Sequence, residues 1–214
     1  MRQEKSVRER PEQMFSQMDR VALDRLAGRD PQRIARNAGV SFDPAAQVFR
    51  FPSMGLDLTV EYPTYRIRPR VSGWHRLLIL HYLDLADGFP LTGRDIPFGQ
   101  MQAGLVRGGG IDRKCEQAFQ QMRELDPARL GALCAALGGE SLKTNADLAF
   151  RLPFLPRFPV TLKVWLPDEE FPASGRMFVD AAADHYFTIE DAVTVAELLL
   201  EQLTVPKENR TFAP

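Results

Sequence analysis

The feature that most constrains the fold is a pattern that occurs twice along the chain in the same order. DPQRI at 30–34 and DPARL at 126–130 both place an Asp before a Pro and a helix. Asp is a preferred N-cap, and Pro is favoured at the first helical position. Glycine follows each helix, at Gly39 and at Gly138, as a left-handed C-terminal cap prefers. The sequence therefore predicts two helices that begin and end in the same way.

A β-hairpin is predicted after each of these helices. AAQVFRFP at 45–52 matches ADLAFRLP at 146–153. The residues that then alternate are Leu56, Leu58, Val60 and Tyr62 in the first copy and Val160, Leu162, Val164 and Leu166 in the second. Alternation with a period of two indicates a strand with one buried face. Each hairpin leads to an amphipathic helix, at 74–86 and at 188–203, and Thr188 and Asp191 have the spacing of a capping box.

These patterns predict an α+β fold built from two related helix–hairpin–helix units, which an internal duplication would explain. We expect the strands of both units to form one largely antiparallel sheet covered by helices, because two joined hairpins leave fewer exposed edges. The expected segments are an N-terminal arm at 1–18, a single domain at 19–205 (first repeat about 19–85, linker 86–114, second repeat about 115–203) and a flexible tail at 206–214.

The linker is rich in Gly and Pro between Ala86 and Gly110. We expect an ordered loop that can include short strands, followed by a helix from Ile111 to Glu124. Long loops in compact domains are more often functional or partner-binding than idle. In VRGGGIDRK at 106–114, successive glycine N–H groups either form a nest for an anion, with Arg107 and Arg113 as ligands, or make a hinge or tight turn.

Composition excludes several classes of function. The net charge is −1, and the 22 Arg and five Lys residues are scattered, which argues against nucleic-acid binding. No apolar run approaches the roughly 18 residues that span a bilayer, and the charged N-terminus has no signal-peptide core, so we expect a cytoplasmic protein without a membrane partner. Cys115 and Cys134 lie on apolar helical stripes and are predicted to be buried thiols. We expect no metal and no cofactor.

Two segments carry a resemblance to a known family. LLILHYLDLADGFPLTGRDIPF at 77–98 and FVDAAADHYFTIEDAVTVAELLL at 178–200 resemble domain-of-unknown-function family 3786, a group of bacterial and archaeal proteins. The resemblance runs over about 21–203 and implies a bacterial domain without an assigned reaction. Some relatives carry a cysteine-rich, iron–sulfur-type segment; this chain has only two distant cysteines, so no cluster is carried over.

The stretch FVDAAADHYFTIED at 178–191 is the first candidate for a site. Asp180 is expected at the end of a strand and His185 just before a helix N-terminus, where ligands gather and anions are favoured. An Asp–His pair there could orient a general base or hold a metal. The competing interpretation is scaffolding, in which Asp180 caps a turn and His185 packs against its neighbours.

Three further residues are candidate ligands. His81 lies on the apolar stripe of its helix, as a ligand or as a buried side chain with one hydrogen-bond partner. Arg50 and Arg151 occupy matching places in FRFP and FRLP, on the strand face away from their Phe neighbours. Two such guanidinium groups could grip an anion, or they could be solvated or paired with local carboxylates.

Two classes of function follow from these observations. The first is a non-catalytic module that binds a small anionic ligand or a partner protein. The second is an enzyme that uses Asp180 and His185 for acid–base chemistry on a small substrate. The sequence contains no complete catalytic motif such as a Walker loop, a nucleophile elbow or HExxH, so we favour the binding module. Oligomeric state is not fixed by any of these patterns.

Overall fold

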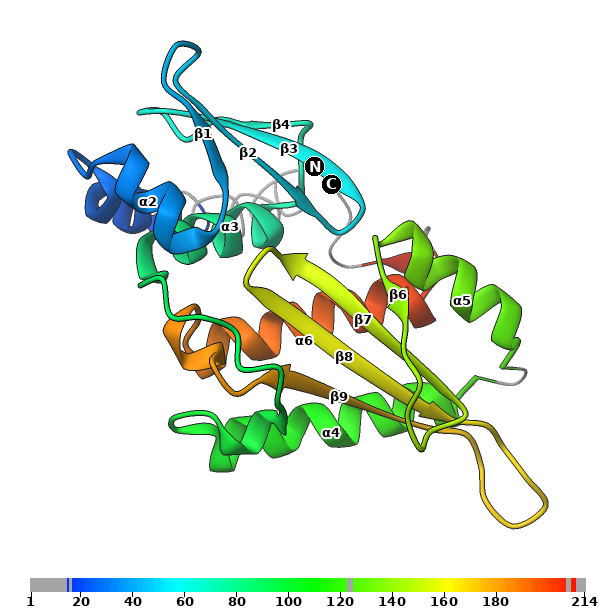
Figure 1. The fold of residues 1–214 in the computed structure, drawn as a ribbon. Coiled ribbons are helices and arrows are strands. Elements are labelled where there is room, and N and C mark those ends of the chain that lie inside the picture. Colours follow the sequence, from blue (N-terminus) through cyan, green and yellow to red (C-terminus); the bar gives the residue numbers. More distant parts are fainter. Residues whose placement is uncertain (1–14, 16, 123–124, 207–208, 211–214) are drawn as a thin grey trace, which may run out of the picture.

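The computed structural model describes residues 15, 17–122, 125–206 and 209–210. Most of the arm predicted at 1–18, and much of the tail predicted at 206–214, lie outside these residues. Helices and two antiparallel sheets make up the fold, which is α+β as predicted (Figure 1). None of the helices in the described ranges is long and apolar enough to cross a membrane.

The first unit contains a four-stranded sheet with the order β1-β2-β3-β4. Residues 17–26 are helical and precede it. The elements that follow are α2 (Pro31–Ala38), β1 (Ser41–Asp43), β2 (Val48–Ser53), β3 (Leu56–Glu61), β4 (Ile67–Arg68) and α3 (Gly73–Leu85).

The second unit contains a five-stranded sheet with the order β5-β9-β8-β7-β6. Its elements are α5 (Pro127–Ala136), β6 (Glu140–Ser141), β7 (Leu148–Leu155), β8 (Phe158–Trp165), β9 (Ser174–Asp180), the 3-10 turn η2 (Ala183–His185) and α6 (Ile189–Thr204). The segment between the units supplies β5 (Asp95–Pro97), the 3-10 turn η1 (Phe98–Gln100) and α4 (Gly104–Gln120). In Figure 1, α6 lies behind this sheet and α4 runs beside β9.

The expectation of one shared sheet is wrong, because each unit keeps a sheet of its own. Hairpin β2–β3 is flanked by the short strands β1 and β4, while hairpin β7–β8 is flanked by β6 and β9. Both edges of each hairpin are therefore occupied by neighbouring strands, three of them short and one, β9, nearly as long as the hairpin strands. The sheets meet instead where the end of β2 approaches β7.

The predicted helix ends are present in both units. Asp30 caps α2 by accepting the N–H of Gln32, and Asp126 caps α5 by accepting the N–H of Ala128. Gly39 and Gly138 both have the left-handed backbone that ends such helices, with φ of 66° and 79°. Thr188 caps α6 by accepting the N–H of Asp191.

A buried polar contact joins the two sheets. The Ser53 hydroxyl at the end of β2 donates to the Phe154 carbonyl of β7 at 2.6 Å. Its single proton is used there, so the Nε2–H of His75 on α3 must donate to Ser53 Oγ, at 2.7 Å. Ser53 is 0% and His75 5% exposed, and burial lowers the pKa of His75 to about 4. One hydroxyl therefore ties β2, β7 and α3 together.

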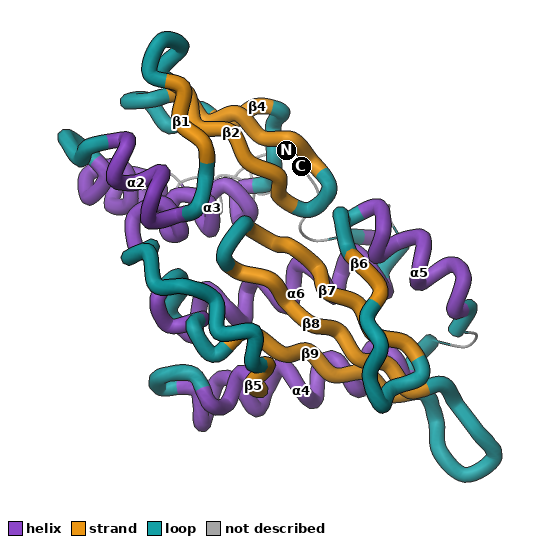
Figure 2. Tube along the Cα trace, in the orientation of Figure 1, coloured by secondary structure: helices purple, strands orange, loops and turns teal. Residues whose placement is uncertain are grey.

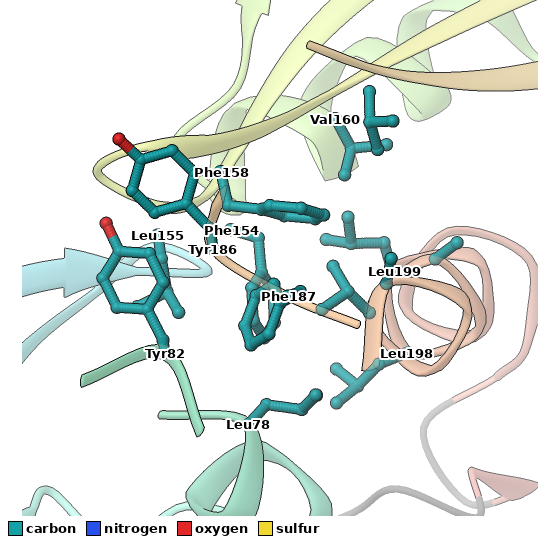
Figure 3. Packing of buried hydrophobic residues seen from close by; sticks show 14 of the residues in the cluster. Leu78, Tyr82, Phe154, Leu155, Phe158, Val160, Tyr186, Phe187, Leu198 and Leu199 are labelled. Carbon is teal, nitrogen blue, oxygen red and sulfur yellow. The ribbon is translucent and has the colours of Figure 1, made fainter. Parts of the chain in front are cut away.

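The main hydrophobic core extends across both units. Figure 3 shows Phe187, just before α6, surrounded by Leu78 of α3, by Phe154 and Phe158 of the β7–β8 hairpin, and by Leu198 and Leu199 of α6. The rings of Tyr82 and Tyr186 stack beside this group. The Tyr82 hydroxyl donates to the carbonyl of Ala38 at the end of α2. These contacts hold α3 against the start of α6.

Helix α4 begins seven residues before the predicted start at Ile111, so the predicted glycine-rich loop ends at Ala103. Gly104 and Gly108 lie one turn apart against the backbone of η1, where a Cβ on Gly108 would lie 2.4 Å from Phe98 C and from Gly99 N. Close packing thus overrides the poor helix propensity of glycine. The N–H groups of residues 108–110 lie within the helix and bond to the preceding turn, which removes the anion nest.

The glycines of α4 provide a matched pair of substitutions. Gly108→Ala should lower the free energy of unfolding by about 1–3 kcal/mol, because its methyl group collides with the η1 backbone. Gly110→Ala should raise it by about 0.5–1 kcal/mol, because no atom lies within 4 Å of that Cβ and alanine favours the helix. Urea unfolding of both variants checks this. Equal effects of the two substitutions would contradict the packing of α4 on η1.

Candidate functional site at the α3–α6 junction

We define the α3–α6 junction as residues 81–94, which end α3 and continue as a loop, together with residues 180–191, which lead from β9 into α6. Figure 2 shows the loop as the long teal segment between α3 and β5. Two of the three histidines of the chain lie at this junction, and each contacts an Asp from the other segment.

The first pair is His81 and Asp191. His81 Nδ1 lies 2.8 Å from Asp191 Oδ1, between α3 and the first turn of α6. A carboxylate only accepts, so Nδ1 carries the proton. The other carboxylate oxygen accepts the hydroxyl proton of Thr188, and Asp191 is only 13% exposed. His81 therefore has a fixed partner and serves to join the two helices.

The second pair is His185 and Asp87. His185 Nδ1 donates to Asp87 Oδ2 at 2.6 Å, and the His185 ring stacks on Phe89 with centroids 3.9 Å apart and planes 4° apart. Burial would raise the pKa of Asp87, but hydrogen bonds from His185 and from the Phe89 N–H outweigh it and lower the pKa. The imidazole is held in one orientation, which leaves Nε2 for another partner.

The two pairs are reciprocal. Asp87 follows His81 by six residues, and Asp191 follows His185 by six residues. Each histidine bonds the aspartate of the opposite segment rather than that of its own. The end of α3 and the start of α6 are thus tied together twice.

Asp180 holds the far end of the loop. Its carboxylate accepts four hydrogen bonds, from the N–H and hydroxyl of Thr92 and from the N–H groups of Gly93 and Ala182. Burial opposes the charged form, but these bonds prevail and lower the pKa of Asp180. The structure does not pair Asp180 with His185. Instead, Asp180 is hydrogen-bonded to the end of the loop and His185 to its beginning.

The junction borders an open pocket of about 370 Å³. Asp184, which faces it, accepts the N–H of Gln102 and so ties the pocket to the start of α4. The lining residues are Leu85, Asp87, Gln102, Ala103, Asp184, His185, Phe187, Thr188, Ile189 and Glu190. Two further pockets, of about 420 and 500 Å³, lie near α5, and no histidine lines either of them.

The four arginines predicted as ligands lie on other surfaces. Arg50 is exposed on β2 opposite Thr59, and Arg151 is exposed on β7 opposite Glu140 and Thr161. Arg107 and Arg113 are exposed on α4, and Arg107 directly follows the exposed Leu105 and Val106. The structure does not bring these arginines together, and they are not among the residues that line the pocket.

Asp87 and Phe89 are the site residues that sequence reasoning missed. Asp87 is hydrogen-bonded to His185, 98 positions away, and the Phe89 ring stacks on the ring of the same histidine. No local sequence pattern connects such distant residues. The equal spacing of His81–Asp87 and His185–Asp191 was the available signal. Cys115 and Cys134 are buried, as predicted, and burial raises the pKa of each thiol to about 12.

Chemically, the lining of the pocket offers one oriented imidazole, three carboxylates and the apolar side chains of Leu85, Phe187 and Ile189. No group of three or more His, Cys, Asp or Glu side chains within the described ranges could hold a metal ion.

Comparison with curated proteins and with solved structures finds no match. A family model does match, over residues 30–202, and those residues include both units and the junction between them. The chain therefore belongs to the family described as "Domain of unknown function (DUF3786)".

Proposed function

We propose that the protein is a non-catalytic binding module. We propose further that it binds a partner protein through one surface, formed by the α3–α6 junction and by residues 102–106 at the start of α4. The observation that carries this proposal is the number of exposed apolar side chains on the segment that lines the pocket. Five of the eight large apolar side chains that are exposed within the described residues lie between 85 and 106, the segment that contributes to this pocket. Of these five, Leu85 lines the pocket itself, and a cluster of exposed apolar side chains on one segment is typical of an interaction site.

A partner protein fits this surface better than a small anion does. Three carboxylates, those of Asp87, Asp184 and Glu190, line the pocket and would repel an anion. The arginines that could attract one lie on β2, β7 and α4, away from the pocket lining. An open pocket with an apolar border also suits a side chain of a larger partner.

The alternative function is acid–base catalysis, and it has one observation in its favour. The 2.6 Å contact between His185 Nδ1 and Asp87 orients Nε2 as in a general base. The pocket supplies little else for a reaction: its one hydroxyl, on Thr188, already donates to Asp191. This alternative would stand if His185→Gln removed a turnover that Val106→Asp left intact.

We also infer that the two units descend from one duplicated unit. Their elements and strand orders follow the same sequence, and Arg50 and Arg151 occupy the same strand position, opposite Ser41 and Glu140. Their contacts are reciprocal as well. Gly55, in the first hairpin turn, lies against the end of α5, and Arg157, in the second, lies against Gly39 at the end of α2.

An experimental structure tests the duplication directly. The Cα atoms of α2 to α3 and of α5 to α6 should superpose element by element, with Arg50 on Arg151. Superposition that matches only one hairpin, or matches the elements in another order, would contradict a common origin.

The binding surface can be located by photo-crosslinking in the native host cell. A benzoylphenylalanine residue replacing Val106, which is 87% exposed, should give a discrete protein adduct. The same residue replacing Phe171, which is 66% exposed and lies outside the proposed surface, is the matched control and should give none. No adduct at position 106, or the same adducts at both positions, would refute the proposed surface.

A further inference from the structure

The first turn of α4 presents an unusual apolar surface. Leu105 is 91% and Val106 87% exposed, whereas the other exposed large apolar side chains of the described residues range from 38% to 66%. Because both side chains are exposed to water, they contribute almost no hydrophobic stabilisation to the folded protein. Their burial against another molecule would remove this apolar surface from water and so favour binding.

The backbone fixes these two side chains in the exposed position. Gly104 and Gly108 press the opposite face of the helix onto η1, and a Cβ on Gly104 would lie 2.3 Å from the Phe98 carbonyl oxygen. Ala103 enters the helix with a left-handed φ of 58°. Asp184 holds the preceding residue by accepting the N–H of Gln102. The exposed pair is therefore presented by a braced turn, which lowers the entropic cost of binding.

The two residues that precede α4, Gln102 and Ala103, line a pocket that contains carboxylates. The pocket that Ala103 and Gln102 line also contains Asp87, Asp184 and Glu190, and His185 is the one residue with a basic side chain among its lining. Leu85 provides an apolar wall there and is 38% exposed. The exposed apolar pair thus follows a pocket-lining residue by two to three positions, and the carboxylates of that pocket favour a basic group.

We propose that the partner is a protein segment that places an arginine or lysine in the pocket and packs apolar side chains over Leu105 and Val106. This inference rests on the proposed function and adds the chemistry of the partner. The alkyl stem of the basic residue lies along Leu85, and its charged end meets the carboxylates. The apolar neighbours supply most of the binding free energy, because exposed ion pairs contribute little. The basic residue sets the register and excludes acidic segments.

A phage-displayed library of random 12-residue peptides, selected on the full chain, tests this chemistry. Enriched peptides should contain an arginine or lysine with apolar residues within one helical turn, and should bind with micromolar Kd by fluorescence anisotropy. Val106→Asp should weaken them at least tenfold, while Phe171→Asp, the matched control, should leave Kd within about twofold. Glu190→Lys should weaken them at least fivefold, and a peptide whose basic residue is changed to Glu should recover that loss.

The outcomes separate the two proposals. Peptides without a basic residue that still lose affinity in Val106→Asp would overturn the partner chemistry and leave the binding surface in place. Peptides that bind Val106→Asp as well as the unchanged protein would overturn both, as would the absence of any enriched peptide. Glu190 and Val106 are exposed, so both variants are expected to fold, which circular dichroism checks.

Discussion

The architecture depends on the place where the two sheets meet without merging. A single hydroxyl, that of Ser53, receives the Nε2–H of His75 and donates to the carbonyl of Phe154. All three residues are buried, so water could not replace a lost partner. Removing one of the three groups would leave a buried polar group without its hydrogen bond. This arrangement fixes α3 against the ends of β2 and β7. Because α3 is fixed at its first turn, its direction toward α6 is fixed as well.

That direction produces the junction. From His75 the helix continues to His81 and Tyr82 and then into the loop. Leu78 and Tyr82 pack on the β7–β8 hairpin and on the segment before α6 (Figure 3). Three hydrogen bonds then hold the loop. Arg157 donates to the Gly88 carbonyl, and the Tyr186 hydroxyl donates to the Phe89 carbonyl. Asp180 accepts the N–H of Thr92. A long connection without regular structure becomes a defined surface because side chains of the second unit satisfy its polar groups. The pocket is thus a consequence of how the two units are joined.

Local signals were sufficient to predict the helix caps and the paired strands, because Asp30, Asp126 and Thr188 act on residues two or three positions away. They were insufficient for features set by distant parts of the chain. The early start of α4 depends on η1 accepting Gly104 and Gly108, and the two sheets are separate because other strands pair with both edges of each hairpin. Asp180 lies at the end of β9, as predicted, but its partners are 87 and 88 positions away in the loop, with only the Ala182 N–H nearby. His185 could likewise be predicted as a candidate from its local sequence, but its partner Asp87 could not, because Asp87 lies 98 positions away.

The protonation of His75 tests the joint between the units most directly. With Ser53 donating to Phe154, Nε2 of His75 must carry a proton, and burial lowers the pKa of His75 to about 4, so the imidazole is neutral at pH 7. Nitrogen-15 NMR of the imidazole should show the Nε2–H form from pH 7 to about pH 5, with protonation only as the pH approaches 4. A proton on Nδ1 at pH 7, or titration near the ordinary value of about 6.5, would show that the hydroxyl does not join the two sheets in this way.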